Sequence, residues 1–291
     1  MRFTPATAAM AVVAFAVTAC ERVVDADIVP ETSQPSEVAA TPAPAPAPSS
    51  RVDGLTISAP AGLPANGAAD IGDCYDIIAA PETRAGRIVA DRGWAVLSEQ
   101  GHDGAEAIVF AGEASTSTSG SCALEDSRAA LYRAGDLVAL IESDGVSADH
   151  LTRVGLSPAG LLRLHGGMVN YDMAVADVAI DANRVIVDAL PDEDRFCDGS
   201  VGVPNVRGED IRTARDRIIA AGWEPVPGDP VNRWTSLPED GVIEMENCSG
   251  TGFGLCRFAY ARASGETLGV VSMGETHSVS GFSVTCEAEA N

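Results

Sequence analysis

Six cysteines between residues 74 and 286 constrain the fold of this chain most strongly. They follow an N-terminal segment typical of an export signal, in which Arg2 precedes an apolar run at residues 8–17. An exported chain enters an oxidising compartment, where an even number of cysteines normally forms disulfides. The sequence has no closely spaced Cys-x2-Cys pair, so we expect no metal at these positions. The predicted disulfide cysteines are Cys74, Cys122, Cys197, Cys248, Cys256 and Cys286.

The leader ends in the tetrapeptide Val-Thr-Ala-Cys at residues 17–20, where small residues precede a cysteine. This segment resembles the lipobox of bacterial lipoproteins. The resemblance implies a signal peptide at residues 1–19, a diacylglycerol group on the Cys20 thiol and acylation of the new amino terminus. Because Glu21 rather than aspartate follows, it also implies an outer-membrane lipoprotein that faces the periplasm. The alternative is an ordinary secretory signal in which Cys20 is incidental.

The charge balance of the chain is strongly acidic. It has 42 acidic and 19 basic residues, a formal net charge of −23, and every basic residue is arginine. This charge excludes long-range attraction to nucleic acid or to anionic lipid, so we expect no nucleic-acid partner. We expect the chain to be attached to the membrane through its N-terminal lipid. The absence of lysine fits either coding bias or arginines placed in two-pronged ion pairs with carboxylates.

Residues 20–61 are predicted to form a lipidated cysteine followed by a Pro/Ala-rich linker. Prolines that alternate with alanine favour an extended polyproline II chain, which spans about 3.1 Å per residue. The linker therefore predicts a spacer of tens of ångströms, with the folded part beginning near residue 62. Its prolines before residue 50 are Pro30, Pro35, Pro42, Pro44, Pro46 and Pro48.

A weak internal repeat predicts two domains, at residues 62–190 and 191–291. In each unit a cysteine is followed by a helix, a Gly-Trp pair, strands and a second cysteine. The first unit holds Cys74, Trp94 and Cys122, and the second holds Cys197, Trp223 and Cys248. Few short helices among many strands predict an α+β fold, in which each domain is an antiparallel sheet with one short helix packed on it. Tandem duplication is one interpretation of the repeat, and chance spacing is the other.

Local signals place both helices and three hairpins. The first helix is expected between Pro81 and Gly93, and the second between an Asp210 N-cap and Gly222. Hairpin turns are expected at the Gly-acid pairs 135–136 and 265–266 and at residues 181–183. The apolar faces of the helices consist of Ala85, Ile88 and Val89 in the first and Ile211, Ala214, Ile218 and Ile219 in the second.

Two disulfide pairings fit the cysteine spacing, and both join Cys74 to Cys122. The repeat favours a set with Cys197–Cys248 and Cys256–Cys286. The competing set pairs Cys248 with Cys256 locally and Cys197 with Cys286.

Residues 203–208, Val-Pro-Asn-Val-Arg-Gly, precede the predicted helix with Ala214 and the turn Ala-Gly-Trp at residues 221–223. This segment resembles the opening of PASTA modules, and the resemblance implies binding of peptidoglycan fragments or β-lactams. The chain departs from that family in having Trp223 where an aliphatic residue is usual, and in its Gly-rich loop between two cysteines. The disulfide-bonded α+β units also resemble secreted inhibitor modules that block β-lactamase or lysozyme, which implies a basic hydrolase as partner.

The sequence carries no motif of an enzyme, a cofactor or a metal site. Gly-x-Ser-x-Gly, His-Glu-x-x-His and phosphate-loop patterns are all missing, and a chain without lysine cannot form a Schiff base. We therefore expect no catalytic residues, no cofactor and no metal ligands, although a hydrolase with an unrecognised site is an alternative. The histidines that such a site would draw on are His102, His150, His165 and His277.

These features predict a membrane-anchored envelope lipoprotein that binds a protein or cell-wall component without catalysing a reaction. Inhibition of a basic envelope hydrolase is the alternative binding function. Aromatic residues make up only 5% of the chain, so few can form a binding patch. The candidates are Trp234, Phe253, Phe282 and Tyr171.

Overall fold

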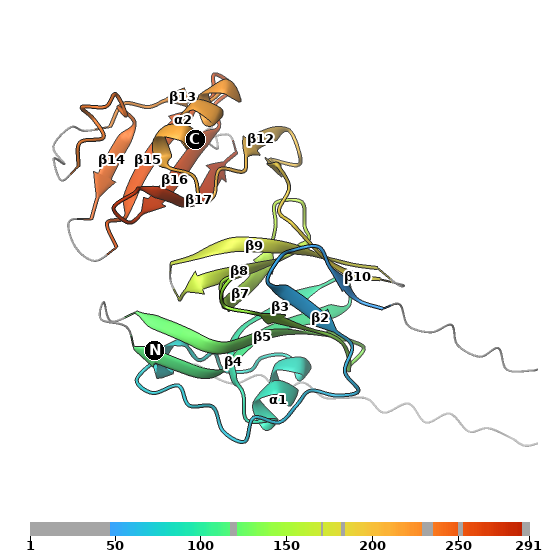
Figure 1. Ribbon diagram of the computed structural model, residues 1–291. Helices are drawn as coiled ribbons and strands as arrows, with labels where there is room; N and C mark the ends of the chain where they lie inside the picture. The colour runs from blue at the N-terminus through green and yellow to red at the C-terminus, as the bar shows by residue number, and fades with distance from the viewer. Residues whose placement is uncertain are drawn as a thin grey trace, which may run out of the picture. The chain divides into compact units, whose positions relative to one another are not determined.

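The computed structural model describes residues 47–116, 121–169, 171–181, 184–228, 235–249 and 253–286. The predicted signal peptide, Cys20 and most of the predicted linker lie outside these residues. Within them, two short α-helices accompany several antiparallel sheets, so the fold is α+β as predicted (Figure 1). No helix in this part of the chain is long and apolar enough to cross a membrane.

Residues 49–188 form an N-terminal sandwich of two five-stranded sheets. The first sheet has the order β2-β6-β5-β4-β3 and the second the order β1-β10-β9-β8-β7. All pairs are antiparallel except β1 with β10. The first sheet comprises β2 (Leu55–Ser58), β6 (Asp136–Ser143), β5 (Cys122–Arg133), β4 (Ala105–Thr116) and β3 (Ala95–His102). The second comprises β1 (Ser49–Ser50), β10 (Val185–Asp188), β9 (Tyr171–Ile180), β8 (Leu162–Met168) and β7 (Leu151–Leu156).

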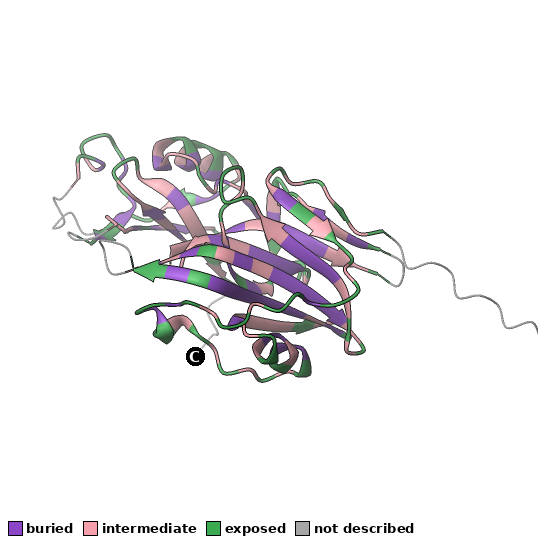
Figure 2. Cartoon of the chain, turned by 60° about the horizontal axis from the view of Figure 1, so that its bottom comes forward, coloured by how far each residue is buried: buried purple, intermediate pink, exposed green. Residues whose placement is uncertain are grey.

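The sandwich core lies between the two sheets, because alternate residues of each strand point inward. Val109 and Leu131 of the first sheet and Leu164 and Val178 of the second belong to one buried cluster. Figure 2 shows buried positions along the strands and exposed positions in the turns. The sandwich corrects the prediction of a single sheet in the first domain, since the local patterns predicted the hairpins but not their division between two sheets.

Helix α1 (Arg84–Asp91) covers the outer face of the first sheet (Figure 1). The Thr83 side chain accepts a hydrogen bond from the Gly86 backbone N–H, which caps the helix. Gly93, with φ +85°, follows the helix end, and Trp94 then packs on the helix and on Phe110. The first helix and its stop are therefore where the sequence predicted them.

Residues 193–286 form a C-terminal module with its own core. The β11–β12 hairpin (Glu193–Phe196, Val201–Pro204) precedes α2 (Ile211–Ala220), which is capped by Asp210 as predicted. The third sheet has the order β13-β15-β16-β17, with β14 also paired to β15. Its strands are β13 (Glu224–Pro225), β14 (Met245–Cys248), β15 (Cys256–Ala261), β16 (Thr267–Met273) and β17 (Ser278–Thr285).

Two strands fall inside the predicted linker, which corrects the expectation that the fold begins near residue 62. Leu55–Ser58 pairs with β6, and the Leu55 side chain is 3% exposed. The alternation Leu-Thr-Ile-Ser carries the strand pattern, and Leu55 gains burial in the sandwich core. The prolines and alanines on either side obscured this short apolar segment in the sequence.

The disulfides follow the competing set. Cys74 pairs with Cys122, Cys197 with Cys286 and Cys248 with Cys256. The set that the repeat favoured is wrong in the second domain, because Cys248 and Cys256 are direct partners on adjacent strands β14 and β15. The duplication is not confirmed, since one unit is a two-sheet sandwich and the other has a single larger sheet.

Candidate functional site

Two of the predicted binding residues line one hollow, which we call the aromatic groove. Its volume is about 340 Å³. Tyr171, the first residue of β9, and Phe282 of β17 both contribute to it. Phe253 lies against Tyr171, with ring centroids 4.4 Å apart, whereas Trp234 lies outside the described residues. The groove is lined by Tyr171, Asp172, Leu255, Arg257, Gly269, Val271, Ser280, Gly281, Phe282 and Ser283.

One side of the groove is formed by the third sheet, which has two glycines there. Gly269 of β16 pairs with Ser283 of β17, and Val271 pairs with Gly281. A methyl group built on Gly281 would meet no other atom within 4 Å, so the sheet is open at this position. A ligand can therefore approach the backbone of the sheet at Gly281.

Arg257 supplies the positive charge of the groove. Its side chain is 59% exposed, and its Nε atom lies 2.9 Å from Glu246 Oε2. An exposed ion pair of this kind contributes at most about 1 kcal/mol, so a ligand carboxylate can compete for the guanidinium at little cost. Arginine also offers two parallel donors, which match the two oxygens of a carboxylate.

Asp172 is held at the groove by a cluster on the outer face of the second sheet. Its Oδ2 atom accepts a hydrogen bond from Arg153 Nε at 3.1 Å and lies 3.2 Å from His165 Nδ1. Burial lowers the pKa of His165. Burial alone would raise the pKa of Asp172, but His165 and Arg153 together hold it below its usual value. The Asp172 carboxylate therefore stays charged, and it also borders a second, more polar cavity of about 330 Å³.

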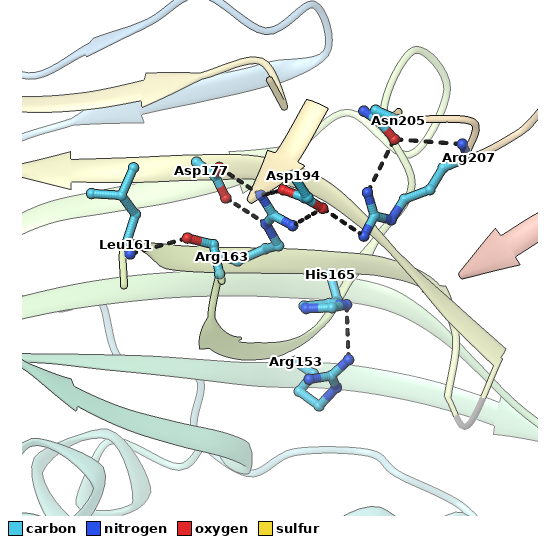
Figure 3. A network of polar contacts seen from close by, with 9 residues as sticks. Arg153, Leu161, Arg163, His165, Asp177, Asp194, Asn205 and Arg207 are labelled. Carbon is cyan, nitrogen blue, oxygen red and sulfur yellow. Dashed lines mark hydrogen bonds and ion pairs between the residues drawn. The ribbon is translucent and has the colours of Figure 1, made fainter. Parts of the chain in front are cut away.

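A buried network of four charged side chains lies beside this cluster (Figure 3). Arg163 donates two hydrogen bonds to Asp177, at 2.6 and 2.8 Å, and two to Asp194, both at 2.8 Å. Arg207 donates a further bond to Asp194 at 3.0 Å. Burial alone would lower the pKa of Arg163, but the two carboxylates raise it above its usual value. Two arginines thus balance two aspartates, and the network joins β8 and β9 to the β11–β12 hairpin.

The network extends to the aromatic groove through Phe282. The Arg207 guanidinium lies 4.0 Å from the centre of the Phe282 ring, and Phe196 packs against the same ring at 6.1 Å. These contacts restrain the groove wall from behind. The roles of Arg153, Arg163 and Arg207 were not predicted from the sequence. The only signal for such ion pairs was the exclusive use of arginine as the basic residue.

The histidines are dispersed and form no triad among the described residues. His102 lies 3.3 Å from the neighbouring Asp103, and His165 belongs to the Asp172 cluster. His277 Nε2 lies 3.2 Å from the Thr235 hydroxyl, but its Nδ1 atom faces Cys256 Sγ at 3.8 Å rather than a carboxylate. A catalytic triad needs a carboxylate that orients the histidine, and no carboxylate takes this position at His277 in the described structure.

Comparisons with protein families, with curated proteins and with solved structures find no match for this chain. In the part of the chain that the structure describes, no group of three His, Cys, Asp or Glu side chains is placed to hold a metal ion. The geometry of the aromatic groove is consequently the main evidence on function.

Proposed function

We propose that this protein is a lipid-anchored envelope protein that binds a cell-wall component at the aromatic groove and catalyses no reaction. The observation that carries the proposal is the meeting of Tyr171, a residue predicted from the sequence, with Arg257 in one hollow, to which Phe282 contributes from the core-facing side of the sheet. The lipobox-like leader, the disulfides and the Pro/Ala-rich segment support the envelope location.

The chemistry of the groove favours a ligand with sugar rings and carboxylates. Aromatic rings pack against the apolar faces of sugars, and Arg257 can pair with a carboxylate. Peptidoglycan fragments carry both groups, and the PASTA resemblance points to the same class. The residues of that resemblance have local structural roles: Val206 and Ala214 are fully buried, and Gly208 and Gly222 have positive φ.

Binding to purified, protein-free peptidoglycan tests this proposal. The mature chain with Cys20→Ser should sediment with the wall material, and Tyr171→Ala or Arg257→Gln should raise the dissociation constant by about tenfold, equivalent to about 1.4 kcal/mol. Arg184→Gln is the matched control, because Arg184 is a 66% exposed arginine paired with Asp181 and lies outside the groove. Equal losses in the groove variants and the control, or no binding by the unaltered chain, would contradict the proposal.

The net charge of −23 favours a second candidate, inhibition of a basic envelope hydrolase. The salt dependence of binding distinguishes the two. Association driven by net charge should weaken strongly near 0.5 M salt, where the screening length is about 4 Å. Binding of wall fragments inside the groove should change much less.

A further inference from the structure

Methionine is distributed unevenly in the folded part of the chain. Four methionines follow Cys20, and three of them line one cavity of about 330 Å³. These are Met168 and Met173 of the β8–β9 hairpin and Met273 at the end of β16. The fourth, Met245, is 2% exposed in the core of the C-terminal module. We call the cavity the methionine pocket; it is also lined by Ala123, Leu124, Gly145, Asp149, His150, Gly167 and Tyr171.

The hairpin register explains why Met168 and Met173 lie on the same side of the sheet. Met168 pairs with Tyr171 across the hairpin, and Gly166 pairs with Met173. Residues two apart on a strand share a face, so Met168, Tyr171 and Met173 point to the same side. A methyl group built on Gly166 would lie 3.1 Å from Asp149 Cβ and 3.1 Å from the His150 carbonyl oxygen, so the segment that carries His150 packs closely against the hairpin here. The Met168 sulfur also lies 3.6 Å from the Ser121 hydroxyl, which orients it.

His150 lines the same pocket. Its Nδ1 atom is buried and has no hydrogen-bond partner within the described part of the chain. A buried polar atom without a partner is unusual, because leaving it unpaired costs about 1–3 kcal/mol. A metal ion is one partner that would satisfy an imidazole nitrogen.

From this set of donors we infer that the methionine pocket binds a soft monovalent metal ion, Cu(I), through the three thioethers and His150 Nδ1. Thioether sulfur prefers Cu(I), whereas hard cations such as Mg²⁺ and Ca²⁺ require oxygen ligands. Tyr171 also lines the pocket, and aromatic rings attract cations. Methionine that only fills a core would leave no open cavity, and Met245 shows that role in the same chain.

Titration with Ag(I) tests the site directly. Ag(I) has the ligand preference of Cu(I) but needs no reductant, so the three disulfides stay intact during the measurement. The protein is the mature chain with Cys20→Ser, which removes the competing thiol. Binding should saturate at one ion per chain. The methyl resonances of Met168, Met173 and Met273 should shift in NMR spectra, while that of Met245 stays in place.

Leucine variants then separate the ligands from the scaffold, because leucine keeps the apolar volume and removes the sulfur. Combined Met168→Leu, Met173→Leu and Met273→Leu should abolish saturable binding. His150→Phe should weaken it by at least about tenfold, since even the loss of a group that only supports a ligand costs that much. Met245→Leu is the control and should bind as the unaltered chain does. Saturable binding by the triple variant would overturn the inference. So would methyl resonances that do not shift, or a shift of the Met245 resonance as large as those of the other three methionines. If the triple variant fails to fold, the shifts of the unaltered chain decide alone.

Discussion

At the scale of single residues, the buried Arg163 network is the feature with the largest energetic consequence. The Asp194 side chain is 2% exposed and accepts hydrogen bonds from both Arg163 and Arg207. Burying charges is costly, so the network stabilises the fold only while every charge is paired. Loss of one carboxylate leaves a buried guanidinium without its full set of acceptors.

We expect Asp194→Asn to lower the free energy of unfolding by about 3 kcal/mol or more, the usual effect of breaking a buried ion pair. Asp188→Asn is the matched control, because Asp188 pairs with Arg51 at the surface and should cost less than about 1 kcal/mol. Urea unfolding at pH 7 measures both values. Equal effects would show that burial of the network adds nothing.

The pH dependence of the same variant follows from the pKa of Asp194. Burial alone would raise this pKa, but Arg163 and Arg207 hold it below its usual value. A carboxyl group with a lowered pKa in the folded state stabilises the fold above its unfolded pKa of about 3.9, and this contribution is lost as the pH falls through the folded value. The stability difference between the unaltered chain and Asp194→Asn should therefore shrink as the pH falls below about 4.

The sequence could not have predicted these partners. Asp177 and Asp194 lie 14 and 31 residues from Arg163, so only the folded sheet brings them together. Tyr171 and Phe282 were selected because aromatic residues are scarce, and the structure then placed both at one groove. The methionine pocket was not predictable from the sequence either, because Met273 is distant in sequence from the β8–β9 hairpin.

At the scale of secondary-structure elements, the sequence predicted a helix or hairpin correctly where the residues that begin and end it were present. Asp210 and Gly222 delimited α2, and the turn at Gly135 predicted the β5–β6 hairpin. Sheet partnership is a long-range property, so the division of the first domain into two sheets was not predictable from hairpins. The pairing that the repeat favoured in the second domain was wrong for the same reason, because the β14–β15 register determines which cysteines face each other.

A pair of substitutions tests whether β2 is an integral strand or part of a spacer. Leu55 is buried in the sandwich core, whereas the adjacent Thr56 is exposed. Leu55→Ala should lower the free energy of unfolding by about 2–5 kcal/mol, as for other buried leucines, and Thr56→Ala should change it by less than about 0.5 kcal/mol. Thermal or urea unfolding compares the two. Near-zero effects for both would restore the linker interpretation.

At the scale of the whole molecule, the proposed function depends on where the chain is held. A groove that binds wall material is useful in the envelope only if the protein is retained there. The lipobox-like leader would provide this retention through acyl chains on Cys20, and more than one chain is needed for stable anchoring. The acidic charge of −23 supplies no attraction to anionic lipid, so net charge does not strengthen this anchor.

We therefore expect the protein expressed with its own leader to fractionate with membranes, and mass spectrometry to find lipid on an N-terminal Cys20. Cys20→Ser should release the chain into the soluble fraction or leave it unprocessed, because each buried CH₂ of an acyl chain contributes about 0.8 kcal/mol to membrane binding. Glu21→Asp is the informative control, since the bacterial sorting pattern predicts that it changes the membrane in which the protein resides without affecting lipidation. An unmodified Cys20 thiol on the mature chain would refute the anchor while leaving the groove and the methionine pocket to be judged by their own binding measurements.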